Sequence, residues 1–209
     1  FGEVVALGSI SGRIFVDSNN DGLFNGSDAG LSGVTATLTG YSYGLNGVDN
    51  GGTGDDGAIT AVSVTTNGAG DYSFTGVVPG RYTVTEPNQP AGTFNGITTP
   101  GGQGGTATAV GVTPSAVSGI SLSGQNAVGY NFGEVAPAAL SGTVYIDSNG
   151  NGLKDAGEAG IGNVAITVSG TDDIGSAVST AVVSAADGSY TINGLRPSGT
   201  GGYTVTETH

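Results

Sequence analysis

The sequence repeats itself at a long interval. The segment Ile10–Leu23 returns almost unchanged as Leu140–Leu153, 130 residues later. Shorter matches follow in the same order: Ala29–Val34 with Ala159–Val164, Gly70–Gly76 with Gly188–Gly194, and Tyr82–Glu86 with Tyr203–Glu207. A repeat of this length is the size of a domain, so the chain is expected to fold as two similar units rather than as one large domain.

The matches also fix the expected boundaries. Phe1–Val4 resembles Phe132–Val135, which closes the first copy. We therefore expect residues 1–7 to be the tail of a preceding repeat and residues 8–135 to form a complete unit. Residues 136–139 would be a linker, and residues 140–209 a second unit truncated before its last strands. The chain is interpreted as a fragment of a longer array.

Short alternating runs predict an all-β fold. Ile10–Val16 and Val34–Thr39 alternate apolar and polar residues at the strand period, and no stretch keeps helical periodicity over three turns. Gly, Asn, Asp and Pro separate these runs, while Tyr41–Gly57 and Pro87–Gly105 are predicted to be long loops. Further strands are expected at Thr60–Thr65, Asp71–Thr75, Arg81–Thr85, Thr106–Val112, Gly119–Ser123 and Val128–Phe132. About seven strands per unit indicate tandem antiparallel β-sandwiches of the immunoglobulin-like, Greek-key kind.

Composition excludes several classes of function. Four Lys and Arg residues face 17 Asp and Glu, for a formal charge of −13, so no basic patch is available for nucleic acid or an anionic membrane. No apolar run approaches the roughly 20 residues needed to cross a bilayer. Cysteine is absent and the single histidine is His209. Disulfides, thiolate zinc sites and histidine-based catalysis are thereby excluded, whereas hard cations remain suitable ligands.

Each unit carries an Asp-x-Asn-x-Asp/Asn-Gly loop directly after its first strand. The loop has the spacing of a twelve-residue EF-hand calcium loop, in which positions 1, 3, 5, 7, 9 and 12 supply oxygen ligands and position 6 is glycine. The predicted ligands are Asp17, Asn19, Asp21, the Leu23 carbonyl, Asn25 and Asp28 in the first unit, and Asp147, Asn149, Asn151, the Leu153 carbonyl, Asp155 and Glu158 in the second.

An ordinary Asn/Asp/Gly-rich hairpin turn is the alternative interpretation of a single such loop. Here the full spacing, including the acid at position 12, occurs twice at equivalent points of a repeat, which favours a metal site. Oxygen ligands select Ca²⁺ over Zn²⁺. Further acids, at positions 49, 55, 56 and 71 and at 172, 173 and 187, are read as solvated loops or as secondary calcium sites.

At these residues the sequence resembles the SdrD B-like repeats of bacterial surface proteins, relatives of the collagen-adhesin B-type (Cna-B) domains. The resemblance rests on the segment Ser11–Gly22, on the Ala-Gly-Leu/Ile after each loop, and on the Gly-x-Tyr and Tyr-Thr-Val-Thr-Glu motifs. It implies a calcium-bound β-sandwich on the cell surface. Many Cna-B domains also carry a glutamate-assisted Lys–Asn cross-link. Glu86 and Glu207 match that glutamate, but the only lysine is Lys154, so calcium is expected to replace the cross-link.

These observations favour a non-enzymatic, calcium-stabilised spacer in an extracellular, cell-surface fibre or stalk. Neighbouring repeats of the same chain are its expected partners, and lateral or end-to-end self-association stays open. The alternative is an adhesin module that binds a glycan or a matrix protein through its long loops, with Tyr41 and Tyr43 stacking on a sugar. Carboxylate pairs for glycoside hydrolysis are a distant third reading, because the acids lie at metal-ligand spacing in turn-rich loops.

Overall fold

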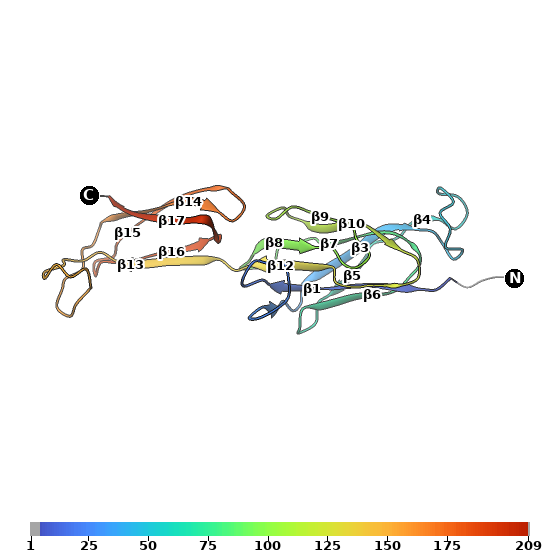
Figure 1. The fold of residues 1–209 in the computed structure, drawn as a ribbon, viewed down its shortest axis with the longest axis horizontal. Coiled ribbons are helices and arrows are strands. Elements are labelled where there is room, and N and C mark those ends of the chain that lie inside the picture. The colour runs from blue at the N-terminus through green and yellow to red at the C-terminus, as the bar shows by residue number, and fades with distance from the viewer. Residues whose placement is uncertain (1–4, 209) are drawn as a thin grey trace. The chain divides into compact units, whose positions relative to one another are not determined.

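The computed structural model describes residues 5–208, which divide into two compact units: unit 1, up to Ala136, and unit 2, from Pro137 onward (Figure 1). The predicted Phe1–Val4 end of a preceding repeat and His209 lie outside the described residues. Within residues 5–208 all regular structure is β, so the predicted fold class is confirmed. No helix in that range is long and apolar enough to cross a membrane.

One sheet of unit 1 is built around strand β1. It has the order β11-β1-β12-β8, and β2 and β6 pair with the opposite edge of β1. The pairings of β1 with β11 and β12 are parallel, which departs from the predicted wholly antiparallel arrangement. The bounds are β1 Gly8–Val16, β2 Ala29–Gly30, β6 Asp71–Val77, β8 Phe94–Thr99, β11 Asn126–Ala127 and β12 Asn131–Val135.

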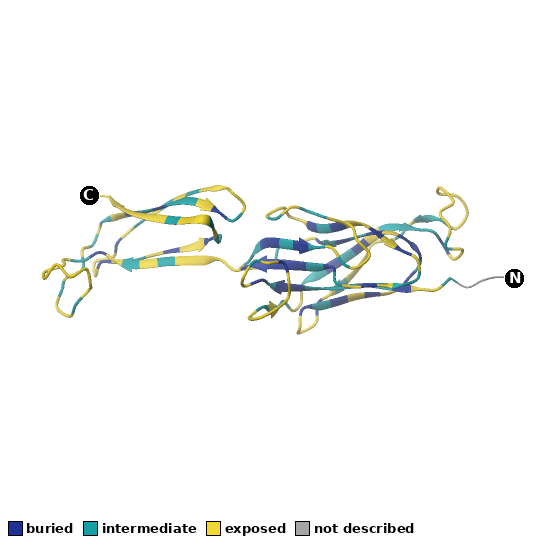
Figure 2. Ribbon diagram, in the orientation of Figure 1, coloured by how far each residue is buried: buried dark blue, intermediate teal, exposed yellow. Residues whose placement is uncertain are grey.

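The second sheet of unit 1 has the order β4-β3-β7-β10-β9, with β5 paired to β3, and all its pairings are antiparallel. Its bounds are β3 Thr35–Ser42, β4 Gly57–Ala58, β5 Val62–Thr65, β7 Gly80–Glu86, β9 Thr106–Ala107 and β10 Ser115–Leu122. The two sheets enclose one core, which is the dark blue interior of unit 1 in Figure 2. Alternation along each strand builds this core: Tyr82, Val84 and Glu86 on β7 are buried, whereas Arg81 is exposed.

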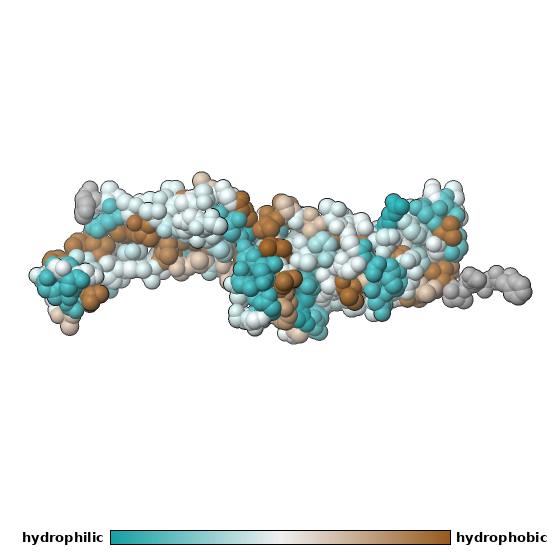
Figure 3. Space-filling view, in the orientation of Figure 1, coloured by the Kyte–Doolittle hydropathy of each residue, from teal (hydrophilic) through white to brown (hydrophobic). Residues whose placement is uncertain are grey.

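Unit 2 repeats the first part of this plan. β13 pairs with β16, and β14 lies between β15 and β17. The bounds are β13 Ala138–Thr143, β14 Ala165–Asp172, β15 Ala177–Val183, β16 Ser189–Leu195 and β17 Ser198–Thr208. Val144, Ile166 and Val205 line a hollow of about 570 Å³, and apolar residues gather between the strand layers of this unit in Figure 3. Val205 is 43% exposed, whereas Val84, its counterpart in unit 1, is fully buried.

Several predicted segments differ from the structure. The expected loop Pro87–Gly105 contains the six-residue strand β8, which pairs with β12. The Gly and Pro residues that flank this strand are typical of loops, and for that reason the sequence pattern did not predict it. The expected strand Thr106–Val112 shrinks to β9, because the chain reverses through a turn that closes with a hydrogen bond from Val112 to Ala109. β10 starts earlier than predicted, at Ser115. In unit 2, β13 begins at Ala138, inside the stretch predicted as a linker.

Close packing of β1 against the end of the chain's first unit depends on Gly12. A Cβ atom at this position would overlap the carbonyl oxygen of Tyr130, which also accepts a hydrogen bond from the Tyr72 hydroxyl (2.6 Å). Gly68, in the turn before β6, has open space around its missing Cβ.

We predict that Gly12→Ala lowers the free energy of unfolding of unit 1 by about 1–3 kcal/mol, because backbone must shift to admit the methyl group. The matched variant Gly68→Ala should change it by less than about 1 kcal/mol. Urea-induced unfolding, monitored by hydrogen exchange of the unit 1 amides, measures the change in unfolding free energy for both variants. Equal effects of the two substitutions would contradict this account of the packing.

Candidate metal centre

The two predicted loops, loop 1 (Asp17–Asp28) and loop 2 (Asp147–Glu158), are held by their own carboxylates. In loop 1, Asp17 at position 1 accepts hydrogen bonds from the backbone amides of positions 5 and 6, at 3.2 and 2.7 Å. Asp28 at position 12 accepts from the amides of positions 2 and 9, at 2.8 and 2.9 Å. Asp17 is only 2% exposed. The first and last acids therefore fold the loop by binding its backbone.

The middle of loop 1 gathers side chains around one carboxylate oxygen. Oδ2 of Asp21 accepts hydrogen bonds from the side-chain amides of Asn19 and Asn25, each at 2.9 Å. Oδ1 of Asp21 accepts from the backbone amide of Leu23 at 2.8 Å. The side chains at positions 3, 5 and 9 thus converge, while the Leu23 side chain is exposed.

Loop 2 has the same arrangement with one exchange. Asp147 accepts from the backbone amides of positions 4, 5 and 6 (2.8, 3.2 and 2.8 Å), and Glu158 from those of positions 2 and 9 (2.7 and 3.1 Å). In the middle, Asn149 and Asn151 both donate to Oδ2 of Asp155 at 2.8 Å. The central carboxylate is therefore at position 5 in loop 1 and at position 9 in loop 2.

These hydrogen bonds favour the ionised form of Asp21, Asp147 and Asp155. The pKa of Asp21 lies below its ordinary value, chiefly because the Asn25 side chain donates to its carboxylate. The backbone amide of position 6 has the main effect in lowering the pKa of Asp147. The side-chain amides of positions 3 and 5 lower the pKa of Asp155. A carboxylate must be ionised to ligate a metal, and the lowered pKa values of Asp21, Asp147 and Asp155 favour that form.

The donor chemistry of both loops fits a hard cation. Each loop offers three carboxylates, two side-chain amides and a backbone carbonyl, the oxygen ligands that calcium prefers. An asparagine amide presents its oxygen in place of its nitrogen after a half-turn about its last bond. In residues 5–208 no group of three or more His, Cys, Asp or Glu side chains is placed to hold a metal ion. Side-chain amides, rather than further acids, stand beside the central carboxylate of each loop.

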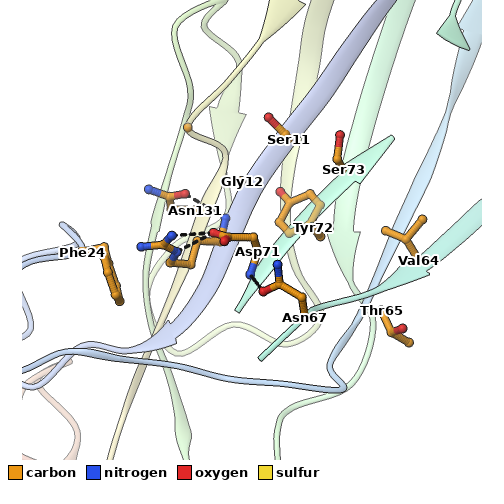
Figure 4. A pocket seen from close by; sticks show the side chains of 12 residues that line it. Ser11, Gly12, Phe24, Val64, Thr65, Asn67, Asp71, Tyr72, Ser73 and Asn131 are labelled. Carbon is orange, nitrogen blue, oxygen red and sulfur yellow. Dashed lines mark hydrogen bonds and ion pairs between the residues drawn. The ribbon is translucent and has the colours of Figure 1, made fainter. Parts of the chain in front are cut away.

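A cation–aromatic contact attaches loop 1 to the sheet. Phe24, at position 8, lies under the Arg13 guanidinium (3.9 Å to the ring centroid) and meets Phe15 edge-on at 5.4 Å. Arg13 forms an ion pair with Asp71 of β6 at 2.6 Å. Arg13, Phe24 and Asp71 are among the residues that line a groove of about 890 Å³ (Figure 4).

Loop 2 makes the corresponding contact with the partners reversed. Its position 8 is Lys154, whose ammonium group lies 5.9 Å from the ring centroid of Tyr145, the counterpart of Phe15. Sequence reasoning missed both contacts, since position 8 supplies no ligand. Strand alternation could have indicated the contact in unit 1, because Arg13 and Phe15 are two residues apart and therefore share one face of β1.

The further aspartates that the sequence singled out accept hydrogen bonds in turns or form ion pairs. In unit 1, Asp55 accepts hydrogen bonds from the Leu45 amide and the Asn46 side chain, and Asp56 from the Asn50 amide. In unit 2, Asp172 and Asp187 accept backbone amides of the turns that follow them, and Asp173 pairs with Arg196. Asp71 pairs with Arg13, and Asp49 lies 4.0 Å from Arg81.

Comparison with known proteins identifies relatives of the chain. The family model of the SdrD B-like domain matches residues 8–123 and 138–209. Two forms of serine-aspartate repeat-containing protein F of Staphylococcus epidermidis are similar: one is 28% identical over 167 residues (80% of this chain, 9% of the relative), and the other 29% identical over 216 residues (95% and 11%). The chain thus spans about a tenth of the length of these curated relatives.

One similar solved structure is that of the Bacillus anthracis TIE protein. It has 17% sequence identity and a TM-score of 0.38, and the match covers 98% of this chain and 29% of that one.

The burial of Asp17 leads to a prediction. In chelator, Asp17→Ala should lower the free energy of unfolding of unit 1 by about 1–3 kcal/mol, because two amides of the loop lose their buried acceptor. Asp147→Ala removes the same carboxylate from the exposed loop 2, and we expect a cost below about 1 kcal/mol. Denaturant titration with residue-resolved exchange compares them. A loss at Asp147 as large as that at Asp17 would show that burial does not set the cost.

Proposed function

Because the chain belongs to the family of SdrD B-like domains, we propose that it is a calcium-stabilised structural repeat of a long surface or extracellular fibre protein, in which it acts as a rigid spacer. The observation that carries this proposal is the hydrogen-bond arrangement shared by loops 1 and 2. The family consists of non-enzymatic repeats of bacterial surface proteins, and membership confirms the predicted location at the cell surface.

In this proposal the residues that converge in each loop hold the ion. Asp17, Asp21 and Asp28 supply charge in loop 1, with amide oxygens from Asn19 and Asn25 after rotation and the carbonyl of position 7. Loop 2 uses the same positions, with carboxylates at 1, 9 and 12. Bound calcium supplies positive charge that offsets the repulsion among three carboxylates in one loop. The loop residues themselves keep the chain reversal at the end of β1 in one shape.

A spacer role is supported by the short connection between β12 and β13 and by the ordered structure of the two segments that were predicted to be long loops. Only Ala136 and Pro137 lie between β12 and β13, far less than a flexible Gly/Ser linker. The alternative, an adhesin module, relied on two long loops. One of them contributes β8 to a sheet, and the other is closed by turns in which Asp55 and Asp56 bind backbone amides. These observations favour the spacer. Neighbouring repeats of the same chain are the proposed partners.

Calcium should raise the unfolding temperature, because an ion that binds only the folded loops stabilises them by about 2.7 kcal/mol at one hundred times its dissociation constant. Calorimetric titration should count one ion in each loop. Asp21→Asn gives loop 1 the position-5 residue of loop 2, and Asp155→Asn gives loop 2 the position-9 residue of loop 1. Each variant removes one carboxylate, and each should weaken binding in its own loop about tenfold or more.

Each variant is the other's control, since the untouched loop must keep its affinity. In chelator both variants should unfold close to the parent protein, because an asparagine oxygen can still accept a hydrogen bond there, from the Leu23 amide in loop 1 and from an asparagine side chain in loop 2. Unfolding that is identical in calcium and in chelator would overturn the calcium proposal while leaving the family assignment intact.

A further inference from the structure

Two glutamates meet between the two sheets of unit 1. Glu86 ends β7 in one sheet, and Glu134 lies on β12 in the other. Glu86 is 2% exposed and Glu134 is 0% exposed, and their side chains lie within hydrogen-bonding reach of each other. The pair therefore spans the interior of the sandwich, away from the solvent that would stabilise two negative charges.

The neighbours of the pair are neutral donors. Ser115 of β10 donates to Oε2 of Glu86 at 2.9 Å. Thr93 donates to Oε2 of Glu134 at 3.2 Å, and the Gln89 side chain donates to the same atom. The buried Oε1 of Glu86 receives no hydrogen bond from the donors of the described residues.

The charged and titratable groups that act on Glu86 are Glu134 from β12 and Tyr72 from β6, and neither is a cation. Burial raises the pKa of Tyr72 above its ordinary value, so this neighbour is neutral. Two ionised carboxylates within hydrogen-bonding reach would repel each other strongly, because neither of the titratable groups that act on Glu86 among residues 5–208 carries a positive charge. A proton on one carboxyl removes the repulsion and converts an oxygen without a donor into a donor itself.

We propose that the Glu86 carboxyl stays protonated at neutral pH and donates a hydrogen bond to the Glu134 carboxylate. The two side chains then form a hydrogen-bonded clamp between the sheets. Burial, reinforced by the charge of Glu134, raises the pKa of Glu86 to about 9, in agreement with this geometry. The clamp extends outward from Glu134, because Gln89 and Thr93 tie the segment after β7 to the same carboxylate. Glu86 thus connects the sheets through a proton in a unit that contains no lysine.

The proposal fixes the sign of a pH effect. A raised pKa in the folded state means that unfolding releases a proton between the ordinary glutamate pKa and about 9. The stabilisation is complete below the ordinary pKa and is lost as the pH rises through 9. The unfolding equilibrium constant of unit 1 should therefore increase about tenfold per pH unit across this window.

Glutamate labelled with ¹³C at the side-chain carboxyl gives the direct test, since the chain has five glutamates. In the intact chain, the Glu86 signal should stay in the protonated position through neutral pH and titrate near 9. Glu207 is the matched control, because it occupies the same place in the repeat but is exposed. A Glu86 signal already ionised at pH 7 would overturn the proposal.

Gln substitutions give an independent test. Glu86→Gln keeps a neutral donor to Glu134 and should abolish the tenfold-per-unit pH dependence, whereas Glu207→Gln should leave it unchanged. An undiminished slope in Glu86→Gln would refute the clamp. Each measurement is made in calcium and in chelator. Equal titration midpoints of Glu86 in calcium and in chelator support a proton between the two carboxyls. A titration midpoint that changes when calcium is added would instead show that a cation binds to the pair.

Discussion

The parallel pairing of β1 with β12 is the contact on which the rest of unit 1 depends. It joins the first long strand to the last across more than a hundred residues of chain, with Ile14 opposite Phe132 and Val16 opposite Glu134. Gly12 leaves room for the returning segment, and the Asn131 side chain accepts the backbone amide of Arg13 at 3.0 Å. The pairing continues into loop 1, where the Asp17 amide donates to the Glu134 carbonyl at 2.7 Å, and the Glu134 side chain is fully buried.

The two loops show which parts of such a motif are fixed by geometry. The carboxylates at positions 1 and 12 bind backbone amides at corresponding places in both loops, so their spacing sets the fold of the loop. The central carboxylate is less constrained, because Asp21 and Asp155 lie at different positions and still collect two asparagine side chains each. The contact at position 8 is similarly tolerant, since the cation and the ring exchange places.

The all-β fold and the position of the two loops could be predicted from the sequence, whereas strand β8 and the glutamate pair could not. Loop spacing is a local property, so the pattern alone was enough to name the residues of each loop, and their role as calcium ligands stays a prediction. Strand β8 was missed because its identity depends on pairing with β12, a distant partner, and its flanking Gly and Pro are typical of loops. The Glu86–Glu134 pair was missed for the same reason. Alternation along β7 does turn Glu86 inward with Tyr82 and Val84, but only the folded sandwich reveals the second carboxyl.

The arrangement of β1 and β12 also bears on how unit 1 responds to a pulling force. β1 leads in from the beginning of the unit and β12 leads out at its end, and the two run side by side in the same direction. Tension applied to the two ends therefore acts along these strands in opposite senses. The hydrogen bonds between them are loaded together in shear, rather than broken one after another as in a hairpin opened from its free ends. A unit connected in this way resists extension through its whole β1–β12 contact at once.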